Sequence, residues 1–242
     1  MSRIAIPASI DASPAASKPL LEAVNAQLGS VPNLFRLVGN SPAALEGYLG
    51  LSGALAKGVV GAKTRERIAL AVAEHNGCDY CLSAHTYLGE RLAKLDPTEL
   101  DAARHARSAE PKVEASLRFA SAVMEAHGHV STSALDEVRR AGYSDAEIVE
   151  IVLHVALNTL TNYVNSVAST EVDFPRVAAR AEYDGLCAVA VSMGERVPSD
   201  ASSTSQHAGR TFRFSSPEAK AMFDADPASF AAKADVRWPQ LG

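Results

Sequence analysis

The sequence predicts a mostly helical protein that ends in a small unit of mixed helices and strands. From about residue 17 to 170, apolar residues recur with helical spacing, helix-start signals repeat, and no stretch shows the strict alternation typical of strands. After Pro175 the pattern changes to short β-prone pieces separated by turn residues. We therefore expect an all-α helical domain over residues 1–176 and a small α+β module over residues 182–242.

Start signals mark where individual helices begin in the first domain. Three such signals stand ahead of apolar periodic stretches: Ser41 with Pro42, Asp96 with Pro97 and Glu99, and the capping box of Ser144 with Glu147. Together with the spacing of the apolar residues, they predict seven or eight helices.

The helix expected from about residue 145 to 168 carries apolar side chains on two sides. One side holds Ile148, Ile151, Val152 and Val155, and the other holds Leu153, Leu157, Leu160, Val164 and Val167. A helix that is apolar on two sides is buried between two layers of structure. The second layer belongs either to the same chain or to a second subunit, so we expect self-association.

In the second domain, residues 183–214 combine the β-prone pieces "LCAVAV" and "RTFRF" with the polar run "GERVPSDASSTSQHAG" between them. Ser216, Pro217 and Glu218 then predict a capped helix, which an Asp-Pro pair restarts. These signals describe a short β element followed by two helices.

Composition excludes several classes of function. The chain has 242 residues, 47% of them apolar, and a net charge of −5. Binding to nucleic acids or to anionic membranes is favoured by a clustered basic surface. This sequence has no such cluster, so we expect neither as a partner. No secretory signal is visible, and the uncharged residues 151–170 include three asparagines, which favours a buried helix over a membrane span. We therefore expect a cytoplasmic location. Thiols stay reduced there, so a close cysteine pair is expected to be redox-active or to bind metal rather than to form a structural disulfide.

Two of the three cysteines lie in the stretch "EHNGCDYCLSAH". The preceding helix is expected to end at Asn76 and Gly77, a pair suited to a left-handed C-cap, and a second helix begins near Cys78. On that helix Cys78, Cys81 and His85 share one face. First-turn N–H groups and the helix dipole stabilise a thiolate, His85 is within reach of the Cys81 proton, and the cysteine pair can close a disulfide. These properties describe a dithiol redox centre.

Two other interpretations of the cysteine pair remain open. The first is a zinc site that combines Cys78 and Cys81 with His75 and His85, although His75 precedes the helix break and no second motif closes a tetrahedral set. The second is a pair of small buried residues without chemistry, which the polar neighbours disfavour.

The stretch "TRERIALAVAEHNGCDYCLSAHTYLG" resembles the alkyl hydroperoxidase D-like branch of the carboxymuconolactone decarboxylase family, whose signature is a glutamate, eleven residues, and then CxxCxxxH. Residues 31–49 are similar to the lead-in helices of that family and residues 160–175 to its closing segment, so the resemblance covers roughly residues 20–175. It implies an all-helical fold that assembles into trimers or larger rings such as hexamers, with peroxidase or disulfide reductase activity and no cofactor.

The resemblance also implies roles for individual residues. Cys81 attacks the peroxide and Cys78 resolves the product, while Glu66 and His85 form a proton relay. Tyr80 stands where the family often has a histidine, and its phenol can still pass a proton. We therefore expect a thiol-dependent peroxidase of hydroperoxides that needs an external dithiol reductant and neither cofactor nor metal.

Two alternative functions remain open. A cofactor-free decarboxylation or lactone reaction would use His85 and Glu66 as acid and base and would survive loss of both cysteines. A non-catalytic thiol sensor or scaffold would form the disulfide without turnover. We expect Glu74 to be solvated near its helix end and His154 to be a hydrogen-bonded core residue. No function is expected for His105, His127, His129 or His207.

The C-terminal segment resembles a YHS-type domain, a small module with an aromatic strand and a helix that follows an Asp-Pro pair. Cysteines follow the strand in many such modules, whereas this chain has Ser215 and Ser216 there. The module is therefore degenerate, and metal binding by it is not expected. Cys187, the third cysteine, is expected to be a small buried residue.

Overall fold

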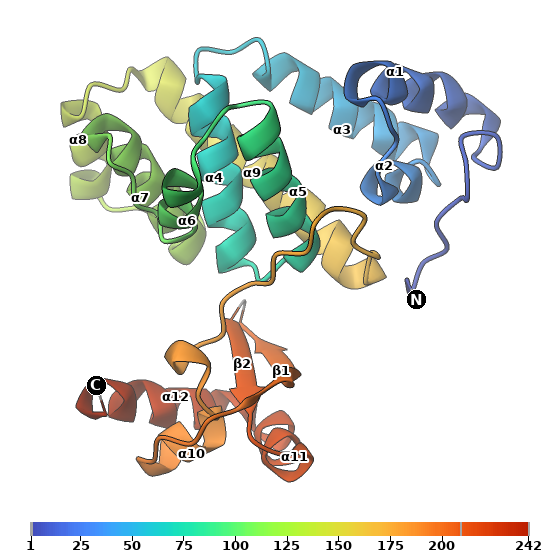
Figure 1. Cartoon of the computed structure of the whole chain (residues 1–242). Helices are drawn as coiled ribbons and strands as arrows, with labels where there is room; N and C mark the ends of the chain where they lie inside the picture. The colour runs from blue at the N-terminus through green and yellow to red at the C-terminus, as the bar shows by residue number, and fades with distance from the viewer. Residues whose placement is uncertain (1, 209, 242) are drawn as a thin grey trace. The chain divides into compact units, whose positions relative to one another are not determined.

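The structure, a computed structural model, describes residues 2–208 and 210–241. The chain divides into two compact units with the boundary between Ala178 and Ala179. The first unit is helical (Figure 1). Its elements are η1 (Ala15–Ser17), α1 (Lys18–Leu28), α2 (Asn33–Val38), α3 (Pro42–Leu55), α4 (Ala62–His75), α5 (Asp79–Arg91), α6 (Pro97–Arg104), α7 (Pro111–Glu125), α8 (Thr132–Arg140) and α9 (Asp145–Ala168).

The described part of the first unit contains nine α-helices, α1 to α9, where the sequence predicted seven or eight. The shortest of them, α2, has six residues. Fewer than two turns are too short for a helical period to show in the sequence, so the prediction undercounted.

The predicted helix starts are confirmed. The side chain of Ser41 accepts a hydrogen bond from the N–H of Ala44, and Asp96 accepts one from Glu99. Ser144 and Glu147 form a reciprocal capping box at the start of α9. Each cap satisfies a backbone donor that the first turn of a helix leaves free, which is why these short signals locate helices reliably.

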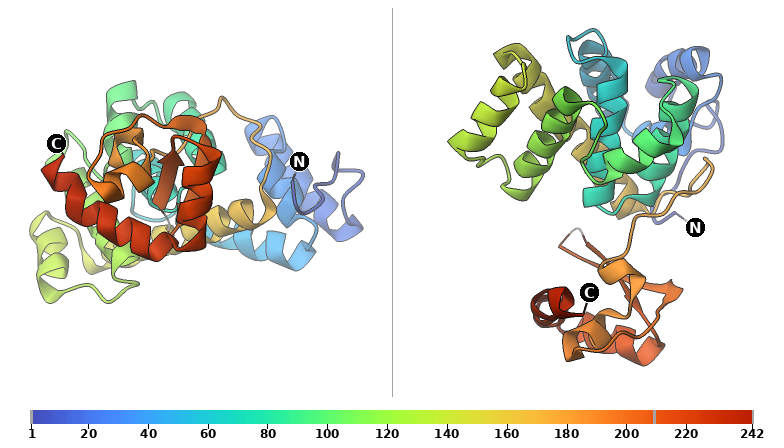
Figure 2. Two further views of the ribbon diagram at one scale, coloured as in Figure 1. Left: turned by 90° about the horizontal axis from the view of Figure 1, so that it is seen from below. Right: turned by 60° about the vertical axis from the view of Figure 1, so that its left-hand side comes forward.

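Helix α4 lies at the centre of the first unit and packs against α5, α6, α7 and α9. Figures 1 and 2 show α4, α5 and α9 side by side. The apolar residues Ile68, Leu70 and Val72 of α4 are completely buried. A helix enclosed on this many sides is a rigid support for polar side chains near its ends.

The two apolar sides of α9 differ in their surroundings. Ile148, Ile151 and Val155 are buried in the first unit. The other side is mixed: Leu157 is buried, whereas Leu160 is 43% exposed and Val167 is 60% exposed. Within the described chain, α9 is therefore covered on one side and only in part on the other. No helix among the described residues combines the length and the apolarity that crossing a bilayer requires.

The second unit combines helices with a two-stranded sheet. Its elements are η2 (Tyr183–Gly185), α10 (Ala188–Met193), β1 (Asp200–His207), β2 (Arg210–Phe214), α11 (Pro217–Ala225), α12 (Pro227–Arg237) and η3 (Trp238–Gln240). The strands are antiparallel, with His207 opposite Arg210. Phe212 and Phe214 of β2 are fully buried against Phe223 of α11, and these aromatic side chains form the centre of the core.

Two predictions for this unit were wrong. The segment "LCAVAV" was expected to be β-prone; its first two residues form isolated β-bridges, but its last four belong to α10. Ala188 and Val191 of α10 are fully buried, and the helix packs against α12. The polar run that follows was not expected to hold a strand, yet half of it forms β1, because pairing with β2 decides its conformation. The predicted starts at Ser216 and at the Asp-Pro pair are confirmed. The YHS-like identity of this unit stays a prediction.

Candidate active site

The break between α4 and α5 places the cysteine pair at the start of a helix. Gly77 adopts a left-handed conformation with φ of 63°, and the N–H of Cys78 donates to the carbonyl of Ala73 over 2.9 Å. Cys78 is then the N-cap of α5, and its sulfur accepts a hydrogen bond from the N–H of Cys81 over 3.3 Å. The predicted helix end and restart are therefore confirmed.

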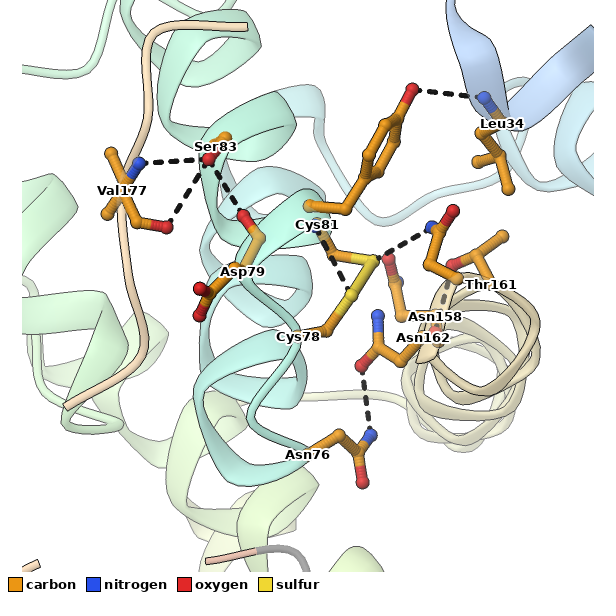
Figure 3. The surroundings of a disulfide bond; sticks show 12 residues. Leu34, Asn76, Cys78, Asp79, Cys81, Ser83, Asn158, Thr161, Asn162 and Val177 are labelled. Atoms are coloured by element: carbon orange, nitrogen blue, oxygen red, sulfur yellow. Dashed lines mark hydrogen bonds between the residues drawn. A yellow bond between two sulfur atoms is a disulfide. The ribbon is translucent and has the colours of Figure 1, made fainter. Parts of the chain in front are cut away.

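Cys78 and Cys81 are joined by a disulfide in this structure, with their Cα atoms 5.3 Å apart (Figure 3). Both residues are 3% exposed. The sulfur of Cys81 also accepts a hydrogen bond from Nδ2 of Asn165 in α9, over 3.3 Å. Two N–H donors therefore point at the pair, one from the backbone of α5 and one from a side chain of α9.

A cavity of about 210 Å³ opens beside the cysteine pair. Cys81 belongs to its walls, whereas Cys78 does not. The polar side chains that line it are Tyr48, Ser52, Arg65, Glu66, Tyr80, His85, His154, Asn158 and Thr161. The structure thus brings Cys81, Glu66, His85 and Tyr80 together around one space, with Cys78 adjoining it through the disulfide.

Glu66 of α4 and His85 of α5 form a hydrogen-bonded pair in this cavity. Oε2 of Glu66 lies 2.9 Å from Nδ1 of His85, and both side chains are roughly three-quarters buried. The carboxylate orients the imidazole and favours the tautomer that carries its proton on Nδ1. Nε2 of His85 then has a lone pair with which it can accept a proton.

Tyr80 lines the cavity but directs its hydroxyl toward α2. The hydroxyl accepts a hydrogen bond from the N–H of Leu34 over 3.0 Å, and the ring packs edge-on against Phe174. Burial, with a smaller contribution from Asp173, raises the pKa of Tyr80 above its ordinary value. The phenol is therefore protonated at neutral pH, and the contact with Leu34 fixes its position.

Two cavity residues, His154 and Tyr48, and one residue that contacts Cys81, Asn165, have features that the sequence did not reveal. Asn165 was noted only as a polar residue in an apolar helix, but it contacts the sulfur of Cys81. His154 is buried, as predicted, yet its Nε2 has no hydrogen-bond partner. Burial, and to a lesser degree Arg65, lowers its pKa to about 4. Burial together with the Glu66 charge raises the pKa of Tyr48 to about 12. For His154 and Asn165, the signal that could have been used is the helical spacing of the polar residues along α9.

Two further expectations concern residues near the motif. Glu74 is not solvated: it pairs with Arg104, and its side chain is 13% exposed, because α6 packs over the end of α4. For the alternative zinc site, residues 2–208 and 210–241 contain no group of three or more His, Cys, Asp or Glu side chains placed to hold a metal ion. His75, the proposed fourth ligand, is the last residue of α4.

The fold and the site define a helical domain that presents a dithiol motif and an acid-base pair to a small cavity. Residues 42–125, which include this motif, match the sequence profile of the Carboxymuconolactone decarboxylase family. The similarity to that family covers about a third of the chain. No curated protein matches the chain.

Several solved structures share the fold. One is the alkylhydroperoxidase AhpD core of a peroxidase-related protein from Ralstonia eutropha JMP134, with 24% identity and a TM-score of 0.65 over 71% of this chain and 92% of that chain. Another is a peroxidase-related protein from Silicibacter sp. TM1040, with 23% identity and a TM-score of 0.63 over 76% and 94%. The debrominase Bmp8 matches with 22% identity and a TM-score of 0.60 over 70% and 91%.

Proposed function

We propose that this protein is a thiol-dependent peroxidase that reduces hydroperoxides through a Cys78–Cys81 disulfide cycle. The observation that carries the proposal is the position of Cys81, which lines a cavity together with the hydrogen-bonded pair of Glu66 and His85 and accepts a hydrogen bond from Asn165. The peroxidase-related names of the proteins that share the fold support the same class of activity.

The first step converts the peroxide to an alcohol. The Cys81 thiolate attacks the terminal peroxide oxygen, the O–O bond breaks, and an S–O bond forms. A proton reaches the leaving alkoxide, so the products are an alcohol and a Cys81 sulfenic acid. His85, oriented by Glu66, accepts the thiol proton beforehand and returns it to the leaving oxygen. Tyr80 packs in the cavity wall beside this pair, and the N–H of Leu34 holds its hydroxyl in place.

The second step restores the disulfide. The Cys78 sulfur attacks the sulfenic sulfur of Cys81, the S–O bond breaks, and water leaves. Reduction of the disulfide to two thiols then takes two electrons and two protons from an external dithiol, which we propose as the partner of the enzyme. The 5.3 Å between the Cα atoms lets the bond open and close with little backbone movement.

Substitution of each cysteine tests the two roles. Cys81→Ser should abolish peroxide turnover, and Cys78→Ser should react once and stop as the sulfenic acid. Intact-mass measurement after one equivalent of peroxide should show loss of two hydrogens in the wild-type protein, with the linkage mapped to Cys78 and Cys81 by alkylation. Cys187→Ser is the matched control and should turn over normally. Full activity of either motif variant would overturn the assigned roles.

A decarboxylase or related lactone enzyme is the second candidate, favoured by the family name of residues 42–125 and by the Glu66–His85 pair. It would use these two residues as acid and base without sulfur chemistry. Activity on a muconolactone that persists in a protein lacking both motif cysteines would support it. A thiol sensor or scaffold, the third candidate, would form the disulfide stoichiometrically but would not turn over.

We also propose that the protein forms a homo-oligomer, a trimer or a hexamer. The exposed apolar side chains of α9 support this, because they form a surface that water solvates poorly. They are Val149, Val152, Leu153, Leu160, Tyr163 and Val167. Light scattering at micromolar concentration should give a multiple of the 25.4 kDa chain mass, whereas a monomer mass would remove this proposal.

A further inference from the structure

The cavity beside Cys81 has a second polar region, formed by Arg65 of α4 and His154 of α9. Along α9 the cavity walls run from Thr161 to His154, seven residues or about 10 Å of helix. Asn165, which contacts Cys81, lies one further turn beyond Thr161. The Arg65–His154 region is therefore displaced along α9 from the reactive sulfur.

The guanidinium of Arg65 is fixed in place without a counter-ion. Its Nη1 donates to the carbonyl of Val60 over 2.9 Å and to that of Ala56 over 3.4 Å. Within the described part of the chain, Arg65 forms no ion pair with a carboxylate. Since the backbone carbonyls occupy Nη1, the Nε and Nη2 donors remain for a ligand in the cavity.

The nearby carboxylates have other partners. Glu66 is hydrogen-bonded to His85. Glu150 accepts hydrogen bonds from the N–H groups of Val59 and Val60, over 3.0 and 2.8 Å. Neither pairs with Arg65, so the positive charge of Arg65 is left for another anion.

His154 adds a polar atom that lacks a partner. The residue is 4% exposed, and its Nε2 is buried without a hydrogen bond. A buried polar nitrogen of this kind costs free energy unless a ligand or a water molecule binds it. Because its pKa is lowered to about 4, the ring is uncharged at neutral pH and can donate one hydrogen bond from Nε2.

The remaining walls restrict the size and nature of the ligand. The apolar residues Leu34, Ala56, Ala69, Ala84 and Leu157 form the rest of the cavity walls. A volume of about 210 Å³ fits a compact organic group rather than a long chain. A small cavity that combines apolar walls with a reactive sulfur and a fixed guanidinium matches a molecule with an apolar body and two different functional groups.

We propose that Arg65 and His154 bind a carboxylate of the substrate, so that the preferred substrate is a compact organic acid with a hydroperoxide at its other end. The guanidinium donates to the carboxylate, and Nε2 of His154 donates to one of its oxygens. The peroxide half of this statement rests on the proposed peroxidase function, whereas the carboxylate site itself does not.

Binding of a ligand without a peroxide group tests the carboxylate site alone. Calorimetry of the full chain with 4-isopropylbenzoate and its neutral analogue 4-isopropylbenzamide should show tighter binding of the acid. Arg65→Gln should weaken binding of the acid about 10- to 100-fold, the loss expected for a charge-assisted contact, and leave the amide unchanged. Lys63→Gln, which removes a charge from an exposed position on the same helix, is the matched control and should change neither.

Turnover tests the substrate class. We expect a higher kcat/KM for cumene hydroperoxide that carries a para-carboxylate than for cumene hydroperoxide itself, and Arg65→Gln should remove this preference. Equal binding of acid and amide by the wild-type protein, or an acid affinity that Arg65→Gln leaves unchanged, overturns the carboxylate site. Charge-dependent binding with no turnover of either peroxide supports the site and refutes the peroxidase function instead.

Discussion

Replacing Asn165 by leucine isolates the contribution of one hydrogen bond to the reactivity of Cys81. In the structure, Nδ2 of Asn165 lies 3.3 Å from the Cys81 sulfur, and Asn165 is 3% exposed. Water cannot readily take over the contact at so buried a position. The leucine side chain has a similar size and also removes Oδ1, which has no partner in the structure, so the fold should be preserved.

The size of the effect follows from the charge of the thiolate. A hydrogen bond to a charged group contributes about 1.5 to 3 kcal/mol, and each 1.4 kcal/mol or so is a factor of ten. Loss of the donor should therefore reduce the thiolate population of Cys81 near neutral pH by about 10- to 100-fold. The rate of any reaction that needs the thiolate falls with it, although the remaining thiolate is somewhat more nucleophilic.

The assay is alkylation of Cys81 by iodoacetamide as a function of pH, in reduced protein that carries Cys78→Ser and Cys187→Ser so that one thiol remains. Asn165→Leu should shift the alkylation profile to higher pH. Asn162→Leu is the matched control, because Asn162 lies on the same helix but its amide oxygen accepts from Asn76 instead. An unchanged profile in Asn165→Leu, or an equal shift in both variants, would refute the role assigned to Asn165.

Two other predictions concern stability. Burial lowers the pKa of His154 from about 6.5 to about 4. The unfolded chain therefore binds a proton at this residue more readily than the folded chain does. The free energy of unfolding should fall by up to roughly 3 kcal/mol as the pH drops from about 6.5 toward 4. Urea unfolding at pH 7 and pH 4.5 should show a smaller loss for His154→Phe than for the wild-type protein, and equal losses would contradict this. Arg67 is 3% exposed and paired with Glu99 and Glu110, so Arg67→Met should lower the free energy of unfolding by about 3 kcal/mol. Arg107→Met, which breaks an ion pair of a largely exposed arginine, should change it by less than about 1 kcal/mol, and similar values for both would be inconsistent with burial as the cause.

Local signals in the sequence predicted much of the helical unit. Ser41, Asp96 and Ser144 each satisfy a backbone donor within their own first turn, so their effect does not depend on the rest of the fold. The break at Gly77 is local for the same reason, since a left-handed residue ends a helix wherever it stands. These features placed the cysteine motif at a helix start before any packing was known.

Contacts between distant segments could not be predicted in this way. Asn165 meets Cys81 across 84 residues of chain, and the carboxamide became informative only once α9 was packed against α5. The helix at Ala188–Met193 and the strand at Asp200–His207 were missed because their conformations depend on α12 and β2 respectively. Local propensity is a weak guide where a partner element decides the outcome.

The first two turns of α5 form hydrogen bonds with two segments that are far from them in sequence. Tyr80 accepts a hydrogen bond from the N–H of Leu34 in α2. The Ser83 hydroxyl accepts one from the N–H of Val177 over 2.9 Å (Figure 3). The disulfide between Cys78 and Cys81 spans the first of these turns. We therefore expect amide hydrogen exchange at Leu34 and Val177 to differ between the disulfide and dithiol forms of the protein, which would report the redox state without a label on sulfur.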